Sequence, residues 1–129
     1  SQAINGYWYT PDVKNGYEEL YINDSNFVTC TGFGFNCSPT FSYELLQDSI
    51  YFYHEGYLHK TIKYSYNPPD SLYLFYDEVS YKYIRNKQGN IDYFSIKDEN
   101  DYKNFMDGFR FRVLESGAFE YFMKHAPSR

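Results

Sequence analysis

The chain has few of the features that mark nucleic-acid-binding or membrane-spanning proteins. Its net charge is −5 and its 12 Lys and Arg residues form no basic cluster, whereas binding to a phosphate backbone needs clustered cations. It contains no apolar run near the roughly 20 residues that a membrane helix requires. We therefore expect no nucleic-acid partner and no membrane span.

Residues for metal binding and catalysis are also sparse. Two cysteines and three histidines do not make the four-ligand pattern of a structural zinc site. His54, Glu55 and His59 flank one turn and could bind a metal, but a solvated hairpin tip is the simpler interpretation. No nucleophile elbow, phosphate loop or zinc-protease helix motif occurs. Glu18 and Glu19 are neighbours on a strand and point to opposite faces, which is wrong for paired carboxylates. We expect no enzymatic activity, no cofactor and no metal.

The two cysteines, Cys30 and Cys37, enclose a glycine-containing loop. In an exported protein a disulfide closing this loop is plausible and would contribute about 2.5 kcal/mol on the chain-entropy model. The alternative is two unlinked thiols. The chain begins with Ser1 rather than Met, which fits a mature exported protein and equally a residue left by cloning. We expect a secreted, periplasmic or cell-surface protein, with a lipoprotein whose signal has been removed as one form of the last.

Alanine is scarce, which disfavours a helical bundle, while aromatic residues make up 23% of the chain, with 17 Tyr and 12 Phe. Flat rings pack well on the pleated, half-buried surface of a sheet. Hydrophobic residues make up 43% of the 129 residues, enough for one domain with a real core. We expect a single, mainly β domain that covers residues 1–129.

Short alternating segments recur about every ten residues up to Arg85 and are separated by turn residues such as Pro, Gly, Asn and Asp. This rhythm is typical of an antiparallel meander, which escapes exposed edges most simply by closing into a barrel. The predicted strands are Gly6–Thr10, Tyr17–Ile22, Phe27–Thr31, Phe41–Leu46, Ile50–His54, Leu58–Tyr66, Leu72–Tyr76 and Val79–Arg85.

Residues 86–129 form an extension to this predicted barrel. Ile91–Ile96 reads as one more strand, and the spacing of the apolar residues predicts a helix over Glu99–Asp107, with a capping box at Ser95–Asp98. The segment Phe109–Lys124 begins with a period of two, and we interpret it as a hairpin, with a continued helix as the alternative.

Gly6-x-Trp8 on the first strand, the up-and-down rhythm to Arg85 and the helix near the C-terminus resemble a small exported bacterial lipocalin-like (calycin-type) β-barrel domain. The resemblance implies a pocket at the barrel mouth for a small hydrophobic or amphipathic ligand. In that family the Gly-x-Trp pair is structural. By this likeness Gly6 permits close approach and Trp8 closes one end of the barrel.

An eight-stranded barrel is either filled by its inward side chains or leaves room for one small ligand. The predicted inward residues are Phe41, Tyr43, Ile50, Phe52, Ile62, Tyr64, Leu72, Leu74 and Tyr76. If a cavity remains, the predicted ligand contacts are Tyr43, Phe52, Ile62, Tyr64, Leu74 and Tyr76. We therefore expect a binding protein whose functional end lies near the loop Gly32–Pro39.

The alternative function is an interaction module that contacts protein or glycan through surface tyrosines, since tyrosine offers a flat apolar face and a hydroxyl. The simpler interpretation is that these tyrosines only support the sheet. The tyrosines considered are Tyr7, Tyr9, Tyr17, Tyr21, Tyr51, Tyr53, Tyr73, Tyr81 and Tyr83.

Overall fold

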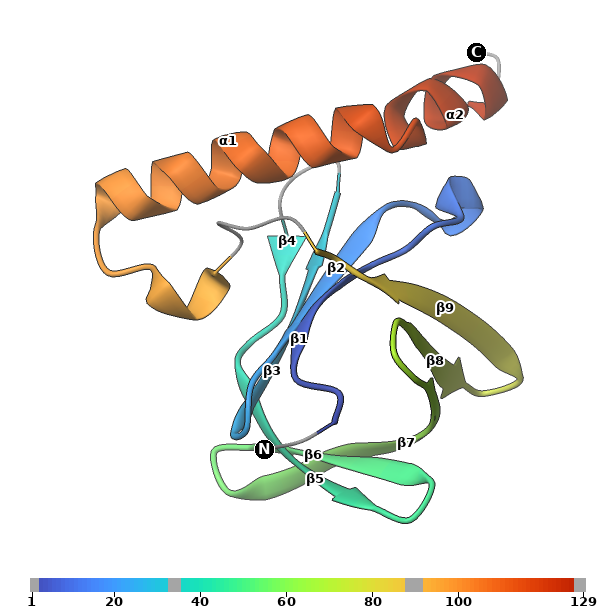
Figure 1. The fold of residues 1–129 in the computed structure, drawn as a ribbon, viewed down its shortest axis with the longest axis vertical. Coiled ribbons are helices and arrows are strands. Elements are labelled where there is room, and N and C mark those ends of the chain that lie inside the picture. The colour runs from blue at the N-terminus through green and yellow to red at the C-terminus, as the bar shows by residue number, and fades with distance from the viewer. Residues whose placement is uncertain (1–2, 33–35, 88–91, 127–129) are drawn as a thin grey trace.

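The structure, a computed structural model, describes residues 3–32, 36–87 and 92–126. Within them an antiparallel sheet of eight strands closes on itself (Figure 1). Each strand pairs with the next and the last pairs with the first, where Trp8 lies opposite Arg85. The mainly β class and the eight-stranded barrel predicted from the sequence are confirmed. The strands are β1 (Gly6–Tyr9), β2 (Glu18–Ile22), β3 (Asn26–Thr31), β5 (Phe41–Leu46), β6 (Ser49–His54), β7 (Tyr57–Asn67), β8 (Ser71–Tyr76) and β9 (Val79–Arg85), with β4 (Asn36–Cys37) as a short extra strand on β3.

Tight turns explain why consecutive strands pair. Three hairpins have two-residue loops at positions 47–48, 55–56 and 77–78. The first residue of each loop, Gln47, Glu55 or Asp77, has a positive φ. Two-residue loops with positive φ match the right-handed twist of the flanking strands. These local geometries therefore favour the up-and-down order of the barrel.

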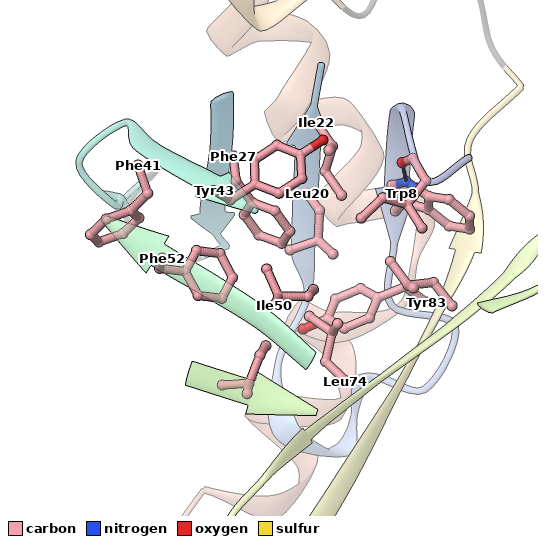
Figure 2. Close-up of a cluster of buried hydrophobic side chains, with 13 residues drawn as sticks. Trp8, Leu20, Ile22, Phe27, Phe41, Tyr43, Ile50, Phe52, Leu74 and Tyr83 are labelled. Atoms are coloured by element: carbon pink, nitrogen blue, oxygen red, sulfur yellow. Dashed lines mark hydrogen bonds between the residues drawn. The ribbon is translucent and has the colours of Figure 1, made fainter. Parts of the chain in front are cut away.

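One half of the barrel interior is filled with apolar side chains. Leu20 and Ile22 point inward from β2 and are fully buried, as their alternation predicts. They meet rings and aliphatic side chains that converge from the other strands (Figure 2). The buried cluster consists of Ile4, Trp8, Leu20, Ile22, Phe27, Phe41, Tyr43, Ile50, Phe52, Ile62, Leu72, Leu74 and Tyr83.

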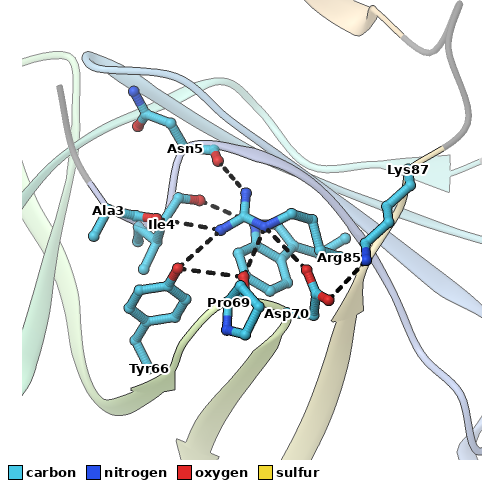
Figure 3. Close-up of polar contacts among 9 residues, drawn as sticks. Ala3, Ile4, Asn5, Tyr66, Pro69, Asp70, Arg85 and Lys87 are labelled. Carbon is cyan, nitrogen blue, oxygen red and sulfur yellow. Dashed lines mark hydrogen bonds and ion pairs between the residues drawn. The ribbon is translucent and has the colours of Figure 1, made fainter.

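Trp8 lies at the end of the barrel that the segment before β1 covers, here called the closed end, and none of its surface is exposed. Its indole Nε1 donates a hydrogen bond to the Ile4 carbonyl at 2.9 Å, so the segment before β1 is held against the barrel. The Arg85 guanidinium stacks 4.3 Å from the Trp8 ring centroid. It also donates to the carbonyls of Asn5 (2.6 Å) and Pro69 (3.0 Å) (Figure 3). Arg85 thus ties the N-terminal segment to the β7–β8 turn.

Two helices and two 3₁₀ turns accompany the barrel: η1 (Val13–Asn15), η2 (Tyr93–Ser95), α1 (Glu99–Glu115) and α2 (Ala118–His125). The helix predicted after residue 98 is present, but Asp98 caps it by accepting from the Asp101 amide, at 2.8 Å, so the predicted capping box at Ser95–Asp98 is wrong. The predicted strand Ile91–Ile96 is also wrong over residues 92–96, because residues 93–95 form η2. Ile91 lies outside the described residues.

The hairpin predicted over Phe109–Lys124 is wrong, because this segment is helical in α1 and α2. Phe105, Phe109 and Val113 are buried at a spacing of four residues, which is a helical stripe. Phe111 lies between two of them in sequence and is 59% exposed. The pattern Phe109-x-Phe111-x-Val113 therefore fits a period of two only by coincidence.

Helix α1 packs on the outer surface of β2 and β3, and α2 continues along the same side of the barrel (Figure 1). A buried ion pair fixes the contact. Glu19 points outward from β2 with no exposed surface, and its carboxylate accepts from Arg112 Nε at 2.7 Å and Nη2 at 3.0 Å. The hydroxyls of Tyr17 and Tyr21 donate to the same carboxylate. Gly108 leaves room here, since a Cβ would lie 3.1 Å from Arg112 Nη1.

Cys30 and Cys37 form a disulfide that joins β3 to β4, with a Cα–Cα distance of 4.0 Å. The predicted bridge is therefore confirmed, and the alternative of two unlinked thiols is wrong. Cys30 is fully buried beneath the helices. No helix among the described residues is long and apolar enough to cross a membrane.

Candidate functional site

A cavity of about 620 Å³ occupies the half of the barrel that lies away from Trp8. Its end is marked by Asn15 between β1 and β2, by Ser38 after β4, and by Tyr76 and Tyr81 beside the β8–β9 turn. Its volume falls within the roughly 300–1,000 Å³ of small-molecule sites. The interior is therefore filled at one end and hollow at the other. The cavity is lined by Asn15, Glu18, Phe27, Thr29, Ser38, Phe41, Phe52, Lys60, Tyr76, Tyr81 and Tyr83.

Glu18 places a carboxylate on the inner wall because it shares the inward face of β2 with Leu20 and Ile22. The hydroxyl of Tyr83 donates to Glu18 Oε1 at 2.7 Å. Among the described residues no hydrogen-bond donor reaches Oε2. Burial raises the pKa of Glu18, and the Tyr83 hydrogen bond and the Lys60 charge offset only part of this effect. The cavity thus holds a partly desolvated carboxylate whose Oε2 has no described donor and keeps contact with solvent, since no buried side-chain oxygen among the described residues lacks a partner.

Lys60 brings the opposite charge into the same cavity. It points inward from β7 in register with Phe52, at the point where the β6–β7 pairing shifts. Its ammonium lies 5.4 Å from the centroid of the Phe52 ring and 5.2 Å from that of Tyr76, within the reach of a cation–π interaction. None of the ion pairs between described residues includes Lys60. Aromatic faces, not a carboxylate, are therefore its direct partners.

Three tyrosines add hydroxyl groups to the apolar wall. Tyr76 and Tyr81 meet edge to face with their ring centroids 5.5 Å apart. Burial raises the pKa of Tyr76 and of Tyr83, and the negative charge of Glu18 raises both further. The hydroxyls of Tyr76 and Tyr83 consequently remain protonated and can act as hydrogen-bond donors.

Two histidines lie at the rim, against the ring of Phe41. His59 stacks on this ring at 5.0 Å, and His54 meets it edge-on at 5.8 Å. His54 Nε2 lies 3.9 Å from Glu55 Oε1, and both side chains are largely exposed. In the described part of the chain, no group of three or more His, Cys, Asp or Glu side chains is placed to hold a metal. The rim histidines thus act as aromatic neighbours of the cavity wall.

Of the six predicted ligand contacts, the structure brings Phe52 and Tyr76 into the cavity lining. The other four lie in the filled part of the core. Tyr43 is turned toward the closed end, where its hydroxyl donates to the Asn23 carbonyl at 2.6 Å. Burial and the charge of Asp24 raise the pKa of Tyr43 to about 12. The remaining three, which pack within or against the apolar cluster, are Ile62, Tyr64 and Leu74.

The tyrosines considered as one outer surface lie in different places. Tyr17 and Tyr21 are buried under α1. Tyr81 and Tyr83 point inward and line the cavity, so their placement on the outside is wrong. Tyr7 and Tyr9 pack against the helix-facing cluster. The three on other outer positions of the barrel wall are Tyr51, Tyr53 and Tyr73, all partly buried.

Sequence reasoning missed Glu18 and Lys60 as cavity residues, although a signal for each was present. Glu18 is two positions before Leu20, an inward residue. Lys60 is two positions before Ile62, another inward residue. A charge at a predicted interior position is expensive to bury, and its presence there indicates either a partner or a function. The period-two pattern of each strand therefore suffices to place both charges on the inner wall.

A second hollow, of about 640 Å³, lies outside the barrel between β1, β9 and the end of α1. It is lined by cations, but each of them already has a partner. Arg112 binds Glu19, Arg85 donates to backbone carbonyls, and Lys87 pairs with Asp70 at 2.9 Å. We therefore place the candidate site inside the barrel, where charged groups remain available.

The chain matches no protein-family model, no curated protein and no solved structure. Its function is consequently inferred from the geometry of the cavity.

Proposed function

We propose that this protein is a non-enzymatic binding protein that carries a small hydrophobic or amphipathic molecule at the open end of its barrel. The observation that carries the proposal is the cavity itself. Six of its eleven described lining residues are aromatic and form surfaces for an apolar body, while the other five bring polar groups that could orient a head group, namely Asn15, Glu18, Thr29, Ser38 and Lys60. Glu18 and Lys60 would orient a polar head group, while Phe27, Phe41 and Phe52 would contact an apolar body.

Other features support a lipocalin-like carrier. The closed eight-stranded meander has the architecture that this likeness implies, and Trp8 is fully buried and does not line the cavity. Among the described lining residues Glu18 is the single carboxylate, whereas acid–base catalysis at paired carboxylates needs two. The disulfide supports an oxidising compartment, and we propose an exported location on that basis.

A protein or glycan partner bound through outer tyrosines has less support. Four of the nine tyrosines are inside the barrel or beneath α1, and those on the outer wall are partly buried. A contiguous aromatic platform of the kind expected for glycan binding is therefore hard to assemble from them.

Filling the cavity tests the carrier proposal. Thr29→Phe would place a ring in the cavity, because Thr29 lies on its inner wall. Ser42→Phe adds the same ring to an exposed position on β5 and serves as the matched control. We expect an apolar fluorescent dye and 1-octanol to bind the wild-type protein and Ser42→Phe equally, and Thr29→Phe at least about tenfold more weakly, as expected when a pocket is blocked. Equal binding by all three proteins, or no binding by the wild type, would contradict the proposal.

A further inference from the structure

The cavity contains two opposite charges that do not touch. Glu18 and Lys60 both line it, yet no nitrogen of Lys60 lies within 4.0 Å of a carboxylate oxygen among the described residues. The charge of Lys60 nevertheless stabilises the ionised form of Glu18. The two groups thus act on each other across the cavity without closing an ion pair.

The position of the Lys60 ammonium marks a place that suits a cation. It lies over the faces of two rings, Phe52 and Tyr76, at nearly equal distances from their centroids, 5.4 and 5.2 Å. Aromatic faces arranged in this way are the recognised means of binding organic ammonium groups. Lys60 reaches them on a flexible four-carbon stem from a largely exposed position, and it has no ion pair with a described residue to hold it there. Its ammonium can therefore leave the rings for solvent.

Glu18 decides which charge an incoming head group should have. Its Oε2 has no hydrogen-bond donor among the described residues, and burial already makes ionisation of its carboxylate less favourable. A second anion placed beside it would be repelled and would raise the cost of ionisation. A cation that replaced Lys60 would instead maintain the charge balance and bring a partner for the open oxygen.

We propose that the ligand of this cavity carries an organic ammonium group on an apolar body, and that the group displaces Lys60 from Phe52 and Tyr76 and pairs with Glu18. This inference rests on the proposed carrier function. Lys60 is then a resident cation that occupies the site until the ligand arrives. The apolar body lies against Phe27 and Phe41, the other two phenylalanines of the lining.

Three probes with the same eight-carbon tail separate head-group preference from general binding. Octylammonium is cationic and carries N–H donors for Glu18 Oε2, 1-octanol is neutral and octanoate is anionic. Each would be titrated by calorimetry, and by competition against an apolar fluorescent dye, at concentrations below micelle formation. We expect the wild-type protein to bind the cationic probe about tenfold more tightly than octanol, as the sum of aromatic and carboxylate contacts would give. Octanoate should bind most weakly.

Two variants test the roles of the charges. Lys60→Met removes the resident cation but keeps an apolar stem, and should strengthen binding of the cationic probe by about three- to tenfold. Glu18→Gln keeps an acceptor for the Tyr83 hydroxyl but removes the negative charge. It should weaken binding of the cationic probe by about tenfold and leave octanol binding unchanged. Lys63→Met on the outer face of β7 and Glu44→Gln on the outer face of β5 remove the same charges at exposed positions, and should leave all three affinities unchanged.

The outcomes separate this inference from the carrier function. If octanol or octanoate binds but the cationic probe does not bind more tightly, the inference is wrong and the carrier function stands. If octanoate binds best and Lys60→Met abolishes its binding, Lys60 is an anchor for an anion, which also overturns the inference. If no probe and no dye binds the folded protein, the carrier function itself is wrong.

Discussion

Replacing Arg112 with methionine would leave the Glu19 carboxylate buried without its cation. Glu19 has no exposed surface, and two of the four hydrogen bonds that it accepts come from the Arg112 guanidinium. The remaining two come from the hydroxyls of Tyr17 and Tyr21. Burial raises the pKa of both tyrosines and the Glu19 charge raises it further, so the hydroxyls stay protonated and cannot supply a positive charge.

Removing one partner of a buried ion pair costs about 3–5 kcal/mol, because the other charge stays buried. That is a large part of the roughly 5–15 kcal/mol by which a domain is stable. At about 4 °C per kcal/mol for a chain of this size, the midpoint of thermal unfolding should fall by roughly 12–20 °C. Burial lowers the pKa of Arg112, but the hydrogen bonds and charge of Glu19 raise it by more, so this cation stays charged well beyond neutral pH.

A second substitution should restore part of the loss. In Glu19→Gln/Arg112→Met the buried group is a neutral amide, which can accept from one tyrosine hydroxyl and donate to the other. We expect this double variant to be more stable than Arg112→Met alone by at least about 1.5 kcal/mol, since the unpaired charge is gone. If Glu19→Gln makes the Arg112→Met variant more stable, the unpaired charge of Glu19 is the source of the lost stability.

Urea unfolding followed by circular dichroism, with the disulfide intact, measures these free energies. Arg110→Met is the matched control, because Arg110 is exposed on the same helix, and it should change stability by no more than about 0.5 kcal/mol. A cost of less than about 1 kcal/mol for Arg112→Met, which a surface pair would also give, would refute the role assigned to the buried charge. A double variant no more stable than the single one would refute it equally.

Three further predictions concern the cavity, the closed end and the disulfide. Burial raises the pKa of Glu18 in the folded protein, so the stability that its protonated form contributes is fully present below pH 4.5 and is lost as pH rises through the folded pKa. Glu18→Gln should therefore be more stable than the wild type at pH 7 and equally stable near pH 3. Urea midpoints across this range check the trend, with Glu44→Gln as control, and a constant difference would count against it. Gly6→Ala should cost about 1–3 kcal/mol of stability from its φ of +134° alone. It should cost more than Gly56→Ala, because the added Cβ would lie 2.6 Å from Arg85 Nη1, whereas nothing lies within 4 Å at Gly56. Equal midpoints of thermal unfolding for the two variants would contradict this. Reducing the disulfide should lower the unfolding free energy by about 2.5 kcal/mol, and unfolding with and without reductant tests whether the short loop contributes as expected.

The barrel was predictable because its information is local. Alternation with a period of two, interrupted by turn residues, indicates each strand without knowledge of the others. The hairpin prediction failed because the same residues fit two periods. Phe109 and Val113 each lie two positions from Phe111, which suits a strand, and four positions from each other, which suits a helix. Only the surface of β2 and β3, which those residues cover, decides between the periods.

The candidate site was predictable in part. The inward face of each strand follows from the alternation, and it correctly includes Phe52 and Tyr76 in the cavity lining. What the pattern does not contain is the depth of each residue along the barrel, which depends on the register between strands and on the place of Trp8. Tyr81 and Tyr83 were placed outside for a different reason, namely that tyrosine suits both a core and a surface.

The neighbouring carboxylates Glu18 and Glu19 show how one strand can separate stability from function. Glu19 faces α1, and each of its oxygens accepts from a tyrosine and from Arg112. Glu18 faces the cavity, where a single described donor reaches it and burial disfavours its charge. Glu18 is partly and Glu19 fully removed from water. If both had a purely structural role, we would expect both carboxylates to have a full set of hydrogen-bond donors and a paired cation. A carboxylate kept ionisable with an open oxygen lowers stability, and such residues concentrate where a protein binds or reacts. The contrast within one strand is therefore stronger support for a ligand at the barrel mouth than the volume of the cavity alone.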